Sequence, residues 1–236
     1  MRSRRSRGLG MARLTAGRCR SYCGSVSGGN LKALLEPHVS ALGFLRGIAW
    51  DKLEELGRQW LRFGRAMNLS GARDLSGLSE QVAEGLEVVA LAERLGCAEG
   101  DRWIDVGSGA GFPGLIVAAC LPVEILLVEP RERRAAFLEL MLAQLRARGR
   151  VIRGRLEEDG IRDERGGLLD RVEFGWASAR AVFSPELWLT RSQTLLAGDG
   201  VTVVHLHRGD ADPLGREAAA SVDGERWSVR GYRRFT

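Results

Sequence analysis

The sequence has no apolar run of the roughly 20 residues that a membrane-spanning helix needs. The longest candidate, LIVAACLPVEILLV, is interrupted by Pro122 and Glu124. The composition, 44% hydrophobic and 28% charged residues, is typical of a soluble globular protein. We therefore expect a soluble protein without a membrane partner. Its 236 residues suffice for one sizeable core with an appendage.

Acidic residues are absent from the first 20 positions, which hold seven arginines. Without those arginines the chain has 28 basic and 30 acidic residues, so the net charge of +5 comes from this tail. Residues 1–29 show no periodicity, and we expect them to form a disordered basic leader. The Arg/Ser-rich composition also fits a transit peptide, an extension ahead of a start at Met11, or an arm that contacts phosphates.

Cysteine is scarce, and its spacing does not suggest a metal site. Cys19 and Cys23 lie in the tail, with no second pair of ligands at zinc spacing. Cys97 and Cys120 are expected to be reduced, partly buried thiols, as in a reducing compartment. We therefore expect a cytoplasmic protein that holds no metal.

Apolar spacing predicts two amphipathic helices in an N-terminal helical segment, residues 30–100. The first spans 46–67, and the second ends near Gly96. The apolar positions that define their faces are Ala49, Leu53, Leu56, Trp60, Phe63 and Met67 in the first, and Leu78, Val82, Leu86 and Val89 in the second.

From residue 101 onward short apolar runs alternate with stretches of helix length. RWIDVG and VEILLVEP each end in an acid and a breaker, as buried parallel strands do. Further strands are expected at RVIRG, VEFGWASA and VTVVHLH, and helices at GFPGLIVAACL, at RERRAAFLELMLAQLRARG (closed by Gly149) and after Ser184-Pro185. The alternation predicts an α/β fold with a doubly wound sheet over residues 101–236.

The stretch WIDVGSGAGFPG, residues 103–114, joins the first of these strands to a helix through four glycines. Such a turn lets the backbone approach a ligand closely. Its second half fits the GxGxxG dinucleotide pattern, which alone is weak evidence. Gly107, Gly109 and Gly111, preceded by Asp105, give the DxGxGxG form typical of S-adenosylmethionine (SAM) methyltransferases. Pro113 has no N–H to offer a pyrophosphate, so the pattern favours SAM over NAD.

Glu129 supports a nucleoside ligand independently of the loop. It ends the next strand, 22 residues after Gly107, where an acid can accept hydrogen bonds from a ribose diol. SAM and NAD both contain such a diol, so Glu129 does not choose between them. Alternatively, Glu129 pairs with Arg131 or Arg133 at the start of the next helix.

Four motifs together resemble the RsmG (GidB) family of 16S ribosomal RNA guanine-N7 methyltransferases. IDVGSGAGFPG resembles the glycine loop of that family, and MNLSGARD (67–74) resembles its MNLT segment. GRLEE (154–158) is similar to the stretch that lines the adenine, and ARAV (179–182) to the arginine motif after the fourth strand. The resemblance extends from about residue 46 to about residue 205 and implies a Rossmann-like SAM-binding fold with N-terminal helices.

The resemblance also implies site residues, a substrate and a partner. The family's cofactor contacts fall on Gly107, Phe112, Leu156, Glu157 and Arg180, with Gly109, Gly111 and Glu129 in support. Asn68 belongs to the segment near the RNA and the active site. The implied activity is methylation of 16S ribosomal RNA, or of a small-subunit precursor, at N7 of a guanine.

Some positions depart from the family pattern. Its His-x-x-Asp-Ser signature in the second helix is replaced by Gln81, Glu84 and Gly85, and Arg208 stands where a lysine is usual. These changes leave open a divergent methyltransferase with another RNA or a small-molecule substrate. They also leave open a non-catalytic remnant that binds SAM or RNA.

The chemistry at guanine N7 needs little from the protein, because N7 carries an exposed lone pair and no proton. Catalysis then comes mainly from positioning and from exclusion of water, which suits a sequence without a convincing nucleophile–base pair. Asp105 either holds the cofactor's amino group or caps the turn. Arg180 holds the cofactor's carboxylate or an RNA phosphate, or lies in solvent. For His205 and His207 we expect structural or surface roles.

Overall fold

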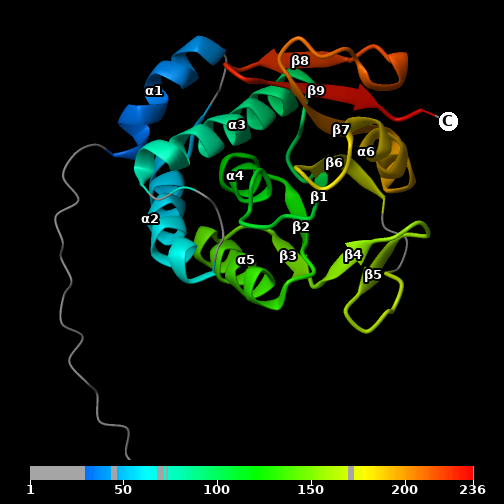
Figure 1. Ribbon diagram of the computed structural model, residues 1–236, viewed down its shortest axis with the longest axis horizontal. Coiled ribbons are helices and arrows are strands. Elements are labelled where there is room, and N and C mark those ends of the chain that lie inside the picture. The colour runs from blue at the N-terminus through cyan, green and yellow to red at the C-terminus, as the bar shows by residue number, and fades with distance from the viewer. Residues whose placement is uncertain (1–29, 44–46, 68–71, 73, 170–172, 236) are drawn as a thin grey trace, which may run out of the picture.

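The computed structural model describes residues 30–43, 47–67, 72, 74–169 and 173–235. It shows a seven-stranded, mostly parallel sheet with helices on both faces (Figure 1). The predicted α/β class with a doubly wound sheet is confirmed. The leader, residues 1–29, lies outside the described residues.

The strand order of the sheet is β3-β2-β1-β6-β7-β9-β8. Five strands pair in parallel: β1 (Arg102–Val106), β2 (Glu124–Val128), β3 (Gly149–Ile152), β6 (Phe174–Ala179) and β7 (Leu196–His207). Strand β9 (Trp227–Arg233) runs antiparallel to both of its neighbours, β7 and β8 (Ala220–Asp223). The chain winds outward from β1 to β3 and then resumes at β6 on the other side of β1. Ligands of such sheets bind at the carboxyl ends of the strands beside this reversal.

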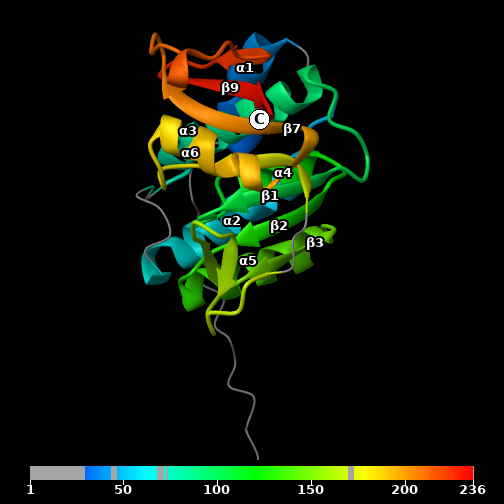
Figure 2. The ribbon, with the colours of Figure 1, turned by 90° about the vertical axis from the view of Figure 1, so that its right-hand side faces the viewer.

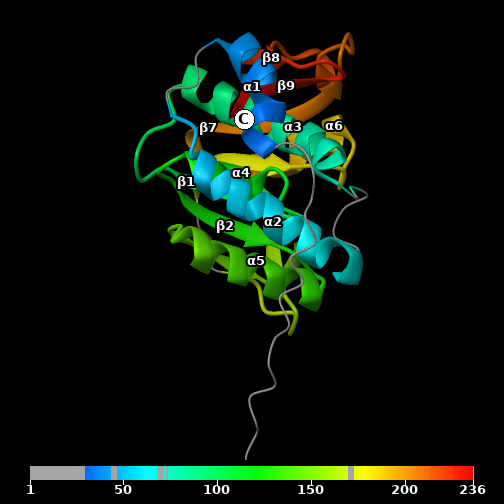
Figure 3. The ribbon, with the colours of Figure 1, turned by 90° about the vertical axis from the view of Figure 1, so that its left-hand side faces the viewer.

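Five helices cover one face of the sheet (Figure 3). They are α1 (Leu31–Leu42), α2 (Trp50–Met67), α3 (Leu75–Arg94), α4 (Gly114–Cys120) and α5 (Glu132–Leu145). The helices expected from apolar spacing correspond to α2 and α3, and residues such as Leu53, Leu56 and Leu86 are at most 1% exposed. The sequence pattern did not single out α1, which begins where Asn30 caps the Ala33 amide.

The other face has a smaller cover (Figure 2). The short helix α6 (Pro185–Arg191) begins at Ser184, whose side chain accepts a hydrogen bond from the Leu187 amide, as the Ser-Pro signal predicts. Beside it are the hairpin β4 (Gly154–Leu156) with β5 (Ile161–Asp163), and two short 3₁₀ turns, Ser192–Thr194 and Pro213–Gly215. The predictions missed this hairpin and the pair β8–β9.

The predicted end of α5 at Gly149 is wrong. The helix ends at Leu145, and Arg146 caps it with a left-handed φ of +51°. Gly149 instead begins β3, where a Cβ atom would lie only 2.4 Å from the Ile125 carbonyl oxygen. Close packing against β2 therefore accounts for this glycine.

Candidate functional site

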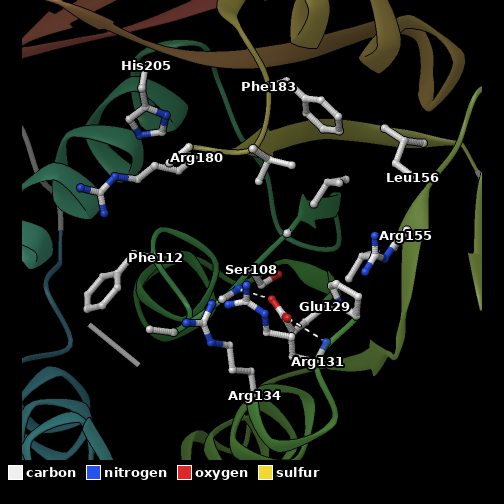
Figure 4. A pocket seen from close by; sticks show the side chains of 18 of the residues that line it. Ser108, Phe112, Glu129, Arg131, Arg134, Arg155, Leu156, Arg180, Phe183 and His205 are labelled. Carbon is white, nitrogen blue, oxygen red and sulfur yellow. Dashed lines mark hydrogen bonds between the residues drawn. The ribbon is translucent and has the colours of Figure 1, made fainter. Parts of the chain in front are cut away.

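A cavity of about 1060 Å³ lies at the carboxyl ends of β1, β2, β6 and β7. Its wall includes the glycine loop, Glu129 with Pro130 and Arg131, residues 154–157, residues 180–183 and residues 205–207 (Figure 4). This is the edge of the sheet at which the fold predicts a ligand. Of the predicted site residues, those that line it are Gly107, Gly109, Phe112, Glu129, Leu156, Glu157 and Arg180.

The glycines of the loop serve backbone conformation and close packing. Gly107 and Gly111 have φ values of +71° and +94°, which side chains disfavour. A Cβ atom at Gly107 would lie 2.4 Å from Val182 Cγ2, and one at Gly111 would lie 2.4 Å from Leu115 Cδ1. Gly109 also has a positive φ, +57°, but a Cβ there would meet nothing closer than 3.7 Å. Gly109 is therefore needed for its backbone conformation rather than for close packing.

Glu129 fixes the loop to the start of α5. Its side chain is buried, and its two carboxylate oxygens accept hydrogen bonds from the backbone N–H groups of Gly109 (2.8 Å) and Arg131 (2.9 Å) (Figure 4). Each carboxylate oxygen can accept a second hydrogen bond. The alternative partner considered from the sequence, Arg131, contacts Glu129 through its backbone amide. Glu129 can thus hold the loop and still accept from a ligand.

Asp105 and Gly111 lie behind the cavity wall rather than in it. The Asp105 side chain is 1% exposed and accepts a hydrogen bond from the Ser178 hydroxyl (2.7 Å), while its backbone carbonyl accepts one from Ser108 Oγ (2.9 Å). Burial raises the pKa of Asp105 to about 6. The Asp105 side chain thus joins β1 to β6 beneath the glycine loop, and its backbone carbonyl bonds within the turn.

Helix α2 supports the loop from the other side. Phe112 stacks on Trp60 with ring centroids 4.3 Å apart, and Trp60 Nε1 donates a hydrogen bond to the Ala110 carbonyl (2.7 Å). The sequence identified Trp60 only as a core residue of a helix. In the structure it also ties the helical segment to the glycine loop.

The cavity has two sides, as Figure 4 shows. Leu156 and Arg155 of the β4 strand lie on one side, and Arg180 and His205 lie on the other. Leu156 is 7% exposed and presents an apolar surface. Glu157 lines the same side, and its amide donates a hydrogen bond to the Gly160 carbonyl (2.8 Å) at the hairpin turn.

Arg180 pairs with Glu84 of α3 across the cavity wall. Their side chains are only 25% and 14% exposed, so the reading of Arg180 as a solvent arginine is wrong. Gln81, one turn before Glu84, also lines the cavity. Gly85 does not: a Cβ there would lie 2.2 Å from Ile116 Cδ1, so this position allows α3 and α4 to approach closely. Of the three positions that depart from the family signature, Gln81 thus lines the cavity and Glu84 contacts it only through Arg180.

Buried titratable groups surround this pair. Glu87, one turn after Glu84, is 2% exposed and lies 3.4 Å from His38 Nε2. Burial and the neighbouring Glu84 raise the pKa of Glu87 to about 8. The ring nitrogens of His205 are buried beside Arg180, and desolvation lowers its pKa to about 3, so His205 is neutral near pH 7.

The free energy of unfolding should fall as the pH rises from about 7 to 8, by up to about 1 kcal/mol. Folded Glu87 keeps a proton that the unfolded chain releases near its ordinary pKa of 4.5, so the stabilisation is complete below that value and is lost as pH approaches 8. In this window Asp105 is already almost fully ionised in both states, and the last protons lost by His205 in the unfolded chain oppose the fall only slightly. Urea denaturation at constant ionic strength measures the slope.

Replacing Glu87 with glutamine should remove most of this slope. The matched control is Glu36→Gln, which changes a 57% exposed carboxylate on α1 and should keep the wild-type slope. A wild-type stability that does not fall between pH 7 and 8 would contradict the assignment.

Several residues that line the cavity were not predicted as site residues from the sequence. They are Arg131, Arg134, Arg155, Phe183, His205, His207 and Trp227. The carboxyl-end rule, applied to the strand VTVVHLH, would have indicated the two histidines, for which structural or surface roles were expected. No pattern indicated Trp227, because the strand that contains it was not predicted.

Some predictions fall outside what the structure can place. Asn68 lies outside the described residues.

Within the described ranges, no three His, Cys, Asp or Glu side chains gather as metal ligands would, and no helix is long and apolar enough to cross a membrane. Cys97 and Cys120 are free, partly buried thiols, and burial raises the pKa of each.

Comparison with known protein families shows which family this chain matches. The family model of GidB, rRNA small subunit methyltransferase G, matches residues 50–212, which is more than half of the chain. The chain belongs to this family. The GidB match contains the glycine loop, Glu129, the β4–β5 hairpin and Arg180, and it ends before β8 and β9.

Individual relatives agree with the GidB assignment. The ribosomal RNA small subunit methyltransferase G of Helicobacter pylori is 30% identical over 150 residues, which cover 63% of this chain and 76% of the relative. The enzyme of the same name from Mycolicibacterium paratuberculosis is 41% identical over 116 residues, 49% of this chain and 44% of the relative. The chain thus matches less than half the length of the mycobacterial relatives.

A solved structure shares the fold of this GidB family member. MtNAS, in a complex with MTA and tNA, is 14% identical with a TM-score of 0.51, and the match covers 86% of this chain and 80% of MtNAS.

Proposed function

We propose that the protein is a SAM-dependent methyltransferase that modifies small-subunit ribosomal RNA at N7 of a guanine. One observation carries the proposal. The glycine loop, Glu129, the β4 strand and Arg180, which lie far apart in the sequence, line a single cavity at the carboxyl ends of the parallel strands. These are the segments in which the chain resembles its family, whose members are named for rRNA methylation.

The side of the cavity near β2 and β4 suits the nucleoside part of SAM. Glu129 can accept hydrogen bonds from the ribose diol because each oxygen has a free acceptor position. Leu156 offers an apolar surface to the adenine, and Glu157 lies beside it. The backbone of Gly107 and Gly109 borders the space for the amino-acid part.

The residues of this chain act by positioning. SAM, when bound, supplies a methyl group on a positively charged sulfonium. Guanine N7 needs no base, so the tasks left to the chain are to orient two ligands and to keep water out. Phe112, packed on Trp60, and Phe183 on the opposite wall supply apolar surface. Arg180, held by Glu84, supplies a fixed positive charge for a carboxylate or a phosphate.

The proposed partner is 16S ribosomal RNA or a small-subunit precursor, encountered in the cytoplasm. We propose further that residues 101–236 form the SAM-binding domain, with the helical segment 30–100 packed on it through α2 and α3. Asn68, which follows α2, is assigned to the RNA side of the site by family resemblance.

The purified chain should bind SAM and not NAD, and it should transfer a methyl group to small subunits from cells that lack this modification. We would measure SAM and NAD binding by calorimetry, and map the methylated nucleotide by cleavage at N7-methylguanine. Subunits taken from wild-type cells, already methylated, serve as the control substrate. SAM binding with transfer to another RNA or a small molecule would favour the divergent enzyme, and SAM binding without transfer would favour the non-catalytic remnant.

A further inference from the structure

Two aromatic rings stack where β7 and β9 meet the cavity. His207, the last residue of β7, lies directly opposite Trp227, the first residue of β9, in the antiparallel register. Their ring centroids are 4.2 Å apart with an interplanar angle of 25°. Both residues line the cavity; His207 is exposed and Trp227 is half-buried.

The sheet order separates this pair from the proposed nucleoside site. Glu129 follows β2, whereas His207 ends β7 and Trp227 begins β9. Strands β1 and β6 lie between β2 and β7 in the sheet. Residue 227 also lies beyond the region that matches the family model, which ends at residue 212. The match to the family model therefore assigns no role to Trp227.

The surroundings of the rings carry charges of both signs, because Asp210 lines the cavity and Glu225 precedes Arg226. The Arg208 guanidinium donates a hydrogen bond to the Gly224 carbonyl (3.3 Å). Arg208 and Arg226 adjoin the two rings in sequence, and both are exposed. The Arg208 amide donates a hydrogen bond to the Arg226 carbonyl (3.0 Å), and the His207 amide donates one to Asp210 Oδ2 (3.0 Å). Aromatic rings beside arginines are the usual means by which proteins hold unpaired nucleotides, through stacking on the base and contact with the phosphate.

We propose that His207 and Trp227 form a stacking platform for an unpaired RNA base next to the target guanine, with the exposed Arg226 beside Trp227 as a phosphate contact. The inference rests on the proposed function, because it names how the RNA substrate is held at the same cavity. A base that is paired in a duplex cannot lie flat on a side chain, so the platform selects a single-stranded segment.

Trp227→Ala should weaken binding of a short single-stranded RNA by about 10-fold or more, as loss of base stacking does elsewhere. Trp227→Phe keeps an aromatic face and should retain most of the affinity. Binding of a duplex of the same sequence, which depends on phosphate contacts, should change little in either variant. Fluorescence anisotropy of labelled RNA at fixed salt measures all three, and SAM affinity serves as the check on the fold.

Three outcomes would overturn the platform. These are an unchanged single-strand affinity in Trp227→Ala, an equal loss in Trp227→Phe, and an equal loss of SAM affinity. If Trp227→Ala does not fold, His207→Ala removes an exposed ring from the same stack and should cause the same selective loss. The test is separate from that of the proposed function, since wild-type protein that fails to bind SAM or to methylate RNA still reports its preference between single strand and duplex.

Discussion

Replacing Glu129 with alanine should raise the Kd for SAM by about 100-fold, which corresponds to about 3 kcal/mol. Two effects add. The diol loses its acceptor, and the backbone N–H groups of Gly109 and Arg131 lose the carboxylate that holds the loop in its bound shape. Calorimetric titration with SAM measures the change, and circular dichroism checks the fold.

The matched control for this substitution is Glu132→Ala. Glu132 lies three residues further along at the start of α5, is 77% exposed and pairs only loosely with Arg153 at 3.7 Å. Glu132→Ala removes the same charge from the same helix end and should change the Kd for SAM by less than about threefold. Equal affinities in Glu129→Ala and the wild type would show that neither the Glu129 carboxylate nor the loop shape that it holds contributes to SAM binding.

Replacing Arg180 with alanine should lower the free energy of unfolding by about 3 kcal/mol, because Glu84 then remains largely buried without its ion-pair partner, with only the weaker attraction of Arg226. The double variant Arg180→Ala/Glu84→Gln should recover most of that stability and none of the ligand affinity, since the loss of binding comes from the missing guanidinium. Urea denaturation and ligand titration of the same samples separate the two effects. Arg148→Ala, which breaks an exposed pair with Glu99, is the control and should cost less than about 0.5 kcal/mol.

Arg180→Lys distinguishes the two ligands proposed for this side chain. A lysine ammonium cannot reproduce two parallel hydrogen bonds to a carboxylate, so impaired SAM binding assigns Arg180 to the cofactor. Near-normal SAM affinity with weaker RNA binding and a flatter salt dependence assigns it to a phosphate. If neither affinity changes in Arg180→Lys or in Arg180→Ala, Arg180 has no part in ligand binding.

The parallel half of the fold could be predicted from the sequence because its signals are local. The runs that end at Asp105 and Glu129 are apolar on both faces, as strands buried between two layers of helices must be. The antiparallel strands β8 and β9 lack such runs: β9 contains Arg230 and Gly231, and its pairing with β7 is a long-range contact that no local pattern reports.

For the site, too, local signals could be predicted from the sequence and long-range contacts could not. Loop residues and Glu129 could be identified because their spacing reflects one turn and one strand end. The partner of Arg180 could not, since Glu84 lies on a helix almost 100 residues earlier and looks like any polar position on an amphipathic surface. Asp105 was expected at the ligand because it adjoins the glycines, but alternation along β1 turns its side chain toward Ser178 on the opposite face from Ile104 and Val106.

The hydrogen bond from Trp60 to the Ala110 carbonyl couples the helical segment to the glycine loop. A ligand that orders the loop must also stabilise the docking of α2, and by reciprocity a partner that engages α2 must change the affinity of the loop for its ligand by the same factor. Helix α2 ends at Met67, immediately before the segment assigned to the RNA side. In the proposed reaction, RNA binding and SAM binding would thus change each other's affinity through the side chains of Trp60 and Phe112, without direct contact between the two ligands.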